Sequence, residues 1–151
     1  MYLNIGQQAP NFNLKNYDGT EIKLDDFKNS QFILWFFPKA NTPGWTLQGC
    51  GFRDEFKKFE DKNIKIVGVS ADSQDKQKKF VEKYNFPYLM LCDESKEMLK
   101  SYKVWGPKKF MGREYAGIHR ISYLIKNGDI KCVFDKVNTK THALDVLNET
   151  N

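Results

Sequence analysis

The pattern of apolar and polar residues along the chain predicts strands that alternate with helices. Continuous apolar runs of strand length at 31–37 (QFILWFF) and 64–70 (IKIVGVS) indicate central strands covered on both faces. A shorter run at 88–92 (YLMLC) predicts a further strand. Apolar positions at helical spacing predict helices at 43–61 and 73–85. This alternation is typical of an α/β sheet with helices on both faces.

Both ends of the sequence carry hairpin signals. Residues 11–24 alternate around an Asp-Gly pair, and two strand-like runs at 120–126 and 130–137 flank an Asn-Gly-Asp turn. Shorter helices are predicted at 95–102 and 139–149. Hairpins of this kind add antiparallel strands to a parallel centre, so the sequence predicts a mixed sheet.

The segment 103–119 fits neither the helical nor the strand period. It contains three glycines and one proline, and we therefore expect a long surface loop there. Long loops within compact domains often carry function.

Size and composition predict one domain over residues 1–151, with 40% hydrophobic and 28% charged residues. The net charge is +5, but lysines and acids are interleaved and no nucleic-acid-binding motif accompanies them, so we expect no nucleic-acid partner. No apolar run approaches the roughly 20 residues of a membrane span. The first residues lack a basic start and an apolar core, which predicts a cytoplasmic protein.

The numbers and spacing of the cysteines and histidines limit which metal sites the chain could build. Three cysteines without C-x-x-C spacing and two histidines cannot build a typical zinc site. We therefore expect no metal and no cofactor. An odd number of thiols also fits a reducing compartment.

The stretch FFPKANTPGWTLQGCGFRD, residues 36–54, carries the candidate chemistry. A strand ends at Pro38, a short loop follows, and a helix is expected to begin near Pro43. Such a helix start presents unpaired N–H groups and partial positive charge, which suits a reactive anion. The residue presented is Trp45, whose indole nitrogen only donates hydrogen bonds. The nearest thiol is Cys50, five positions later.

Several spaced motifs resemble the peroxiredoxin family, and its bacterioferritin comigratory protein (Q-type) group most closely. They are GQQAPNFNL, FFPKANTPGWTLQGCGFRD, IVGVSAD and KKFMGREYAGIHRISYLI, in the family's order. The resemblance runs from about residue 4 to 148. It implies a thioredoxin-like fold with a mixed central sheet, helices on both faces and an N-terminal β-hairpin.

The resemblance also implies the roles of individual residues. The family's P-x-x-x-T-x-x-C signature matches Pro38 and Thr42, but Trp45 stands where the peroxidatic cysteine is expected. Cys50 matches the resolving cysteine of the Q-type group, and Arg120 matches the family's distal arginine. A thiolate at the helix start would be stabilised by Arg120, which is always charged and rich in donors.

The function implied is thioredoxin-dependent reduction of hydrogen peroxide and organic hydroperoxides, in cell redox homeostasis, by a protein that is monomeric as Q-type relatives often are. With Trp45 in place of the nucleophile, we expect little or no activity from the chain as written. Trp45 is interpreted as a native replacement, an engineered knockout or a product of decoding, and the otherwise intact context of PGWT favours a native or decoded tryptophan.

Three alternatives stay open from the sequence. The chain could be a non-catalytic binding or holdase-like module in which Arg120 packs over Trp45, or it could perform one-cysteine chemistry at Cys50. Its basic surface also allows polyanion binding. A raised or unperturbed pKa at Cys50 argues against the second alternative.

Overall fold

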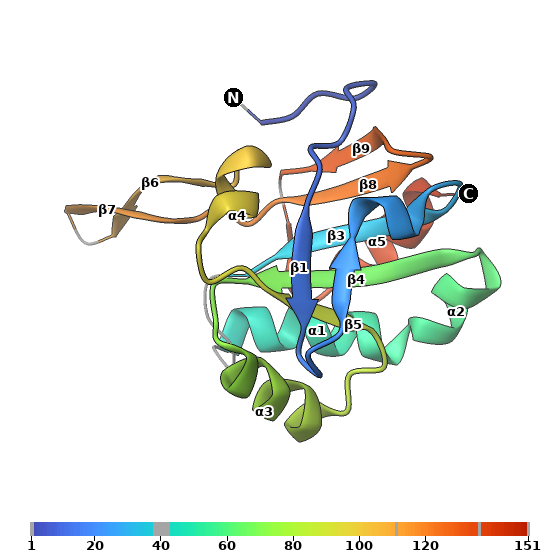
Figure 1. Ribbon diagram of the computed structural model, residues 1–151, viewed down its shortest axis with the longest axis horizontal. Helices are drawn as coiled ribbons and strands as arrows, with labels where there is room; N and C mark the ends of the chain where they lie inside the picture. Colours follow the sequence, from blue (N-terminus) through green and yellow to red (C-terminus); the bar gives the residue numbers. More distant parts are fainter. Residues whose placement is uncertain (1, 38–42, 111, 136, 151) are drawn as a thin grey trace.

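A seven-stranded mixed sheet forms the centre of the fold in a computed structural model (Figure 1). The structure describes residues 2–37, 43–110, 112–135 and 137–150, without the side chains of 43–45, 109 and 110. The strands, in spatial order, are β2 (Glu21–Lys23), β1 (Asn13–Asn16), β5 (Leu89–Cys92), β4 (Ile64–Ser70), β3 (Gln31–Phe36), β8 (Ser122–Lys126) and β9 (Asp129–Phe134).

The middle of the sheet is parallel and its margins are antiparallel. Strand β4 pairs in parallel with both β3 and β5, whereas β8 pairs antiparallel with β3, β9 with β8, and β1 with both β5 and β2. The hairpin strands at the two ends of the chain supply the antiparallel margins. This arrangement confirms the mixed sheet and the N-terminal hairpin that the sequence predicts.

Strand β3 is buried on both faces, as its continuous apolar run predicts. Alternate side chains point to opposite faces. Phe32, Leu34 and Phe36 belong to one apolar cluster, and Ile33 and Trp35 belong to the other. All five are fully buried. The two clusters therefore share this strand as their common wall.

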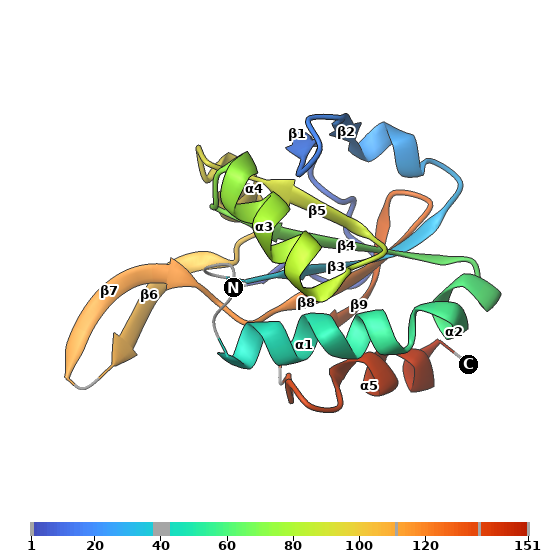
Figure 2. The ribbon, with the colours of Figure 1, turned by 90° about the horizontal axis from the view of Figure 1, so that it is seen from below.

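Helices cover both faces of the sheet, also as predicted (Figure 2). Those on the Trp35 side are α1 (Pro43–Asp54), α2 (Phe56–Asp61), α3 (Gln74–Tyr84) and α5 (His142–Glu149). The opposite face is covered by α4 (Glu97–Ser101) and by a 3-10 turn, η1 (Leu24–Phe27), which the sequence does not predict. None of the described helices is long and apolar enough to cross a bilayer.

The helix predicted at 43–61 is interrupted. Helix α1 ends at Asp54 and α2 begins at Phe56, because Glu55 has φ −102° and ψ 10°, outside the α-helical range. The carbonyl of Glu55 accepts bonds from the backbone N–H groups of Lys58 and Phe59, which start the second helix. Phe59 stays fully buried after the break.

The long loop predicted at 103–119 is wrong. The structure forms a two-stranded antiparallel hairpin there, β6 (Trp105–Phe110) and β7 (Arg113–Ile118). Trp105 faces Ile118 in the register, and Gly112, at φ +80°, supplies the left-handed conformation at the turn. In both views the hairpin extends away from the rest of the chain, so little burial marks its strands in the sequence (Figures 1 and 2).

His142, on helix α5, is a buried polar residue for which the sequence suggests no partner. Its Nε2 lies 2.9 Å from Oγ of Ser122 on β8, and its ring meets Phe52 and Phe134 edge-on. Burial lowers the pKa of His142 from 6.5 to about 4, an effect that the charge of Asp145 partly opposes. The imidazole is therefore neutral at neutral pH.

This pKa predicts a loss of stability in mild acid. The unfolded chain takes up a proton at His142 below about pH 6.5, whereas the folded chain resists it until about pH 4. The free energy of unfolding should therefore be fully retained above pH 6.5 and fall by about 3 kcal/mol as the pH drops to 4. Urea unfolding at several pH values measures this. His142→Gln should lose that part of the pH dependence and the matched His119→Gln should keep it. The same slope in both variants would contradict the assignment.

Candidate functional site

Helix α1 begins at Pro43, as the sequence predicts, at the carboxyl edge of the sheet. The chain reaches it from the end of β3 through residues 38–42, so Pro38 and Thr42 lie outside the described residues. Trp45 is the third residue of the helix, and its side chain is also outside the described part of the chain. Its backbone position is in the first turn, where the N–H groups lack partners within the helix.

Arg120 comes to the same edge of the sheet from the other side. It lies between β7 and β8, and β8 begins with Ser122 opposite Trp35, near the end of β3. The side chain is half-buried, and burial lowers the pKa of its guanidinium, which remains a cation at neutral pH. The fold thus brings Arg120 and the start of α1, which are far apart in the sequence, to one edge.

Cys50 lies in the middle of α1, away from that edge. It is half-buried and packs against the apolar cluster on the Trp35 side. Burial raises the pKa of its thiol, and the nearby Arg53 only partly offsets this. A raised pKa keeps the thiol protonated at neutral pH, and a protonated thiol is a poor nucleophile.

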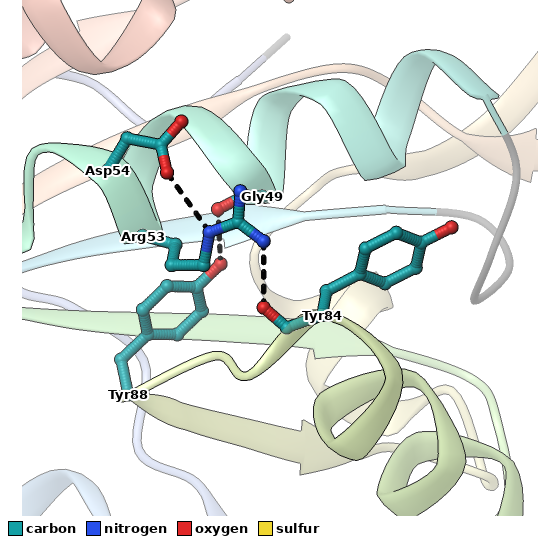
Figure 3. Close-up of polar contacts among 5 residues, drawn as sticks. All are labelled: Gly49, Arg53, Asp54, Tyr84 and Tyr88. Carbon is teal, nitrogen blue, oxygen red and sulfur yellow. Dashed lines mark hydrogen bonds and ion pairs between the residues drawn. The ribbon is translucent and has the colours of Figure 1, made fainter.

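Polar contacts hold the helix around Cys50 to Tyr84, the last residue of α3, and to Tyr88, which lies just before β5 (Figure 3). Tyr88 donates its hydroxyl to the carbonyl of Gly49 over 2.8 Å, and Arg53 donates Nη1 to the carbonyl of Tyr84 over 2.8 Å. Nε of Arg53 also donates to the carboxylate of Asp54 over 3.0 Å. Gly49 and Arg53, on either side of Cys50 in the helix, are therefore held by hydrogen bonds to Tyr88 and Tyr84.

Gly49 is where α1 comes closest to the residues beneath it. A Cβ at this position would lie 2.9 Å from Cζ of Phe86, 3.1 Å from Cη2 of Trp35 and 3.2 Å from the hydroxyl of Tyr88. The first distance is shorter than real Cβ contacts, and the other two are so tight that the neighbouring side chains would have to give way. Two residues on, a Cβ at Gly51 would have an ordinary contact of 3.8 Å with Ala143 of α5.

The described residues were also compared with what a metal site or another cavity would require. Among the described parts of the chain, no three His, Cys, Asp or Glu side chains come together as metal ligands. A depression of about 790 Å³ lies at the opposite edge, where β3 and β4 begin, and neither Cys50 nor Arg120 lines it.

The sequence did not identify the contacts that position Cys50. Tyr88 and Tyr84 are more than thirty positions away from Gly49 and Arg53, and no local pattern connects them. The aromatic richness of 84–88 (YNFPY) is the one signal that could have drawn attention to this segment. Arg53 carries no such signal, because a single arginine on a helix is usually a surface residue.

Comparisons with known proteins identify the chains and the family that this sequence resembles. The model of the AhpC/TSA family matches residues 5–133. Peroxiredoxin Bcp of Bacillus subtilis is 42% identical over 148 residues, with 97% of this chain and 94% of that protein covered. Peroxiredoxin Bcp of Escherichia coli is 41% identical over 147 residues, with the same shares covered.

Solved structures are similar over nearly the whole chain. A cysteine-to-serine mutant of PrxQ from Xylella fastidiosa superposes with a TM-score of 0.92 at 30% identity, covering 99% of this chain and 96% of that one. Xanthomonas campestris bacterioferritin comigratory protein, solved for insight into its alkyl peroxide reduction activity, gives a TM-score of 0.87 at 28% identity, covering 92% and 89%. These superpositions confirm the predicted thioredoxin-like fold.

The close contact at Gly49 predicts opposite effects for two neighbouring substitutions. Gly49→Ala should destabilise the protein by about 1–3 kcal/mol, because the methyl group forces Trp35, Phe86 or Tyr88 to move. Gly51→Ala, its matched control, should stabilise it by up to about 1 kcal/mol, because alanine favours the helix and has room. Thermal unfolding of both variants measures the difference. Equal effects would show that α1 does not pack this closely.

The environment of Cys50 predicts slow reaction with alkylating agents. In a Cys92→Ser/Cys132→Ser variant, the rate of reaction with iodoacetamide should rise with pH at a midpoint above that of the same chain in urea. Burial is the cause, so unfolding should remove the difference. A midpoint in the folded chain at or below the unfolded one would indicate an activated thiol and support chemistry at Cys50.

Proposed function

The chain belongs to the AhpC/TSA family and, within it, to the Bcp and PrxQ type of peroxiredoxin, a family of thiol peroxidases, and from this premise we propose that it is a peroxidase scaffold impaired at its nucleophile. The active form of the site would reduce hydrogen peroxide and organic hydroperoxides and be re-reduced by a thioredoxin-like protein. Trp45 is the observation that carries the proposal of impairment.

The chemistry explains why position 45 matters. Peroxide reduction needs a thiolate that attacks one peroxide oxygen, forming an S–O bond while the O–O bond breaks and hydroxide or alkoxide leaves. The helix start offers N–H groups and partial positive charge to such a thiolate, and Arg120 offers a cation at the same edge. An indole supplies no thiolate, so the stabilising framework has nothing to act on.

The remaining family positions take supporting roles in this proposal. Pro38 would shield the thiolate position, and the hydroxyl of Thr42 would bond to the peroxide or the thiolate. Cys50 keeps the resolving position, where it would attack a sulfenic acid at position 45 after the helix opens locally. We propose further that the protein acts as a monomer.

Cys50 does not replace the missing nucleophile in this proposal. Five residues along a helix correspond to a rise of about 7.5 Å and a rotation of about 140° beyond a full turn. Cys50 therefore points away from the position of Trp45 and lies beyond the turn where the helix dipole acts. The raised pKa of its thiol weighs further against one-cysteine chemistry.

Restoring the nucleophile tests the proposal. Trp45→Cys should increase hydroperoxide turnover with thioredoxin and its reductase by at least about a thousandfold, because loss of a nucleophile costs several orders of magnitude. The rate of NADPH consumption with hydrogen peroxide and with an organic hydroperoxide measures this. Trp45→Ser is the matched control, because it removes the indole and adds no thiol.

Two outcomes would contradict the proposal. Turnover by the unaltered chain comparable with that of Trp45→Cys would show that the site works without a cysteine at position 45. A folded but inactive Trp45→Cys would show that the framework around it is not a working site. In that case the non-catalytic binding or holdase-like alternative would be favoured, and it would be tested by loss of partner binding in Trp45→Ala.

A further inference from the structure

A disulfide between positions 45 and 50 cannot form while helix α1 is intact. In a regular α-helix the Cα atoms of residues five positions apart are separated by about 9 Å, whereas a disulfide requires less than about 7 Å. Residues 46–49 must therefore leave the helical conformation before Cys50 can reach position 45. Any contact that holds this stretch against the sheet opposes the resolving step.

Gly49 is the point at which this stretch is held. Its carbonyl oxygen accepts a hydrogen bond of 2.8 Å from the hydroxyl of Tyr88, and the rings of Trp35 and Phe86 leave no room for a side chain on it. Figure 3 shows Tyr88 reaching from the segment before β5 to the helix, with its hydroxyl directed at Gly49. Opening of the helix at this point requires the bond to break.

Tyr88 has no easy alternative to this partner. Its side chain is buried, and its ring stacks on Phe86 with the centroids 5.3 Å apart. Burial raises the pKa of Tyr88 well above its usual value of 10, so the hydroxyl stays a donor at neutral and mildly alkaline pH. A buried donor that loses its acceptor carries a desolvation cost, and this cost opposes the opening of α1.

Arg53 gives the opening segment a fixed end. Its Nη1 donates to the carbonyl of Tyr84, the last residue of α3, where the helix dipole favours a cation. This contact lies after Cys50, outside the stretch that must unwind. The first part of α1 can therefore open while Phe52 stays packed on Trp35.

We infer that Tyr88 is a positioning residue for the resolving step, because its hydroxyl keeps α1 closed at Gly49 and sets how often Cys50 is released towards position 45. In that step the Cys50 sulfur attacks the sulfur of a sulfenic acid at position 45. An S–S bond forms, the S–O bond breaks, and the thiol proton leaves with the hydroxyl as water. This chemical consequence rests on the proposed function, whereas the opening itself is measurable in the unaltered chain.

Hydrogen exchange in the unaltered chain and in Tyr88→Phe tests the restraint on α1. The variant keeps the ring and loses one hydrogen bond, so the amides of residues 48–52 should exchange about two- to tenfold faster. Tyr123→Phe is the matched control, because Tyr123 also donates a buried hydroxyl to a carbonyl, that of Tyr102, over 2.8 Å. It should leave exchange in α1 unchanged. No acceleration in Tyr88→Phe, or equal acceleration in both variants, would overturn the inference.

A competition between two products in Trp45→Cys measures the consequence for the resolving step. In excess hydrogen peroxide, a sulfenic acid at position 45 either forms the disulfide with Cys50 or reacts with a second peroxide, which transfers one oxygen atom and leaves as water. Adding Tyr88→Phe should raise the ratio of disulfide to sulfinic acid about two- to tenfold, and adding Tyr123→Phe should not change it. Mass spectrometry after blocking of free thiols measures the ratio.

The two experiments separate this inference from the proposed function. A ratio that Tyr88→Phe does not raise would overturn the role of Tyr88 in the resolving step. Absence of both products in Trp45→Cys would contradict the proposed peroxidase function, and the exchange measurement would then decide alone whether Tyr88 holds the helix closed.

Discussion

The close packing of helix α1 against the sheet is the constraint on which the rest of the structure depends. At Gly49 the helix comes so near to Trp35 and Phe86 that there is room only for a hydrogen atom. Phe52, one turn further on, packs against Trp35 with ring centroids 5.5 Å apart. This contact holds the helix axis in place along β3. Because β3 and α1 are joined by only a few residues, it also determines where the helix begins.

One helix therefore provides two different chemical environments. Its first turn stands at the carboxyl edge of the sheet, where unpaired N–H groups and Arg120 favour negative charge. Its middle, around Cys50, is held down by Tyr88 and Arg53 and is partly closed off from water. A thiol is favoured as an anion in the first place and as a neutral group in the second. The reactivity of a cysteine in α1 therefore depends on its position along the helix.

The sequence predicted the helices and strands whose buried faces produce a regular pattern of apolar residues. Both faces of β3 are covered, so its continuous apolar run is informative, and the Asn-Gly turn at Asn127 marks the β8–β9 hairpin. The β6–β7 hairpin escaped prediction because exposed strands need no apolar alternation. The partnership of His142 with Ser122 escaped because it joins residues twenty positions apart through the fold. The family resemblance proposed Cys50 and Arg120 as site residues, but their burial and the pKa of each depend on neighbours that only the structure brings together.

The projecting β6–β7 hairpin has a consequence for how the protein behaves at high concentration. A two-stranded ribbon exposes backbone groups along both outer edges, and such edges can recruit strands from other molecules. Here β6 contains Pro107, which has no N–H to offer a further strand. The β6 edge of the hairpin is thus a poor template for the addition of strands from other molecules.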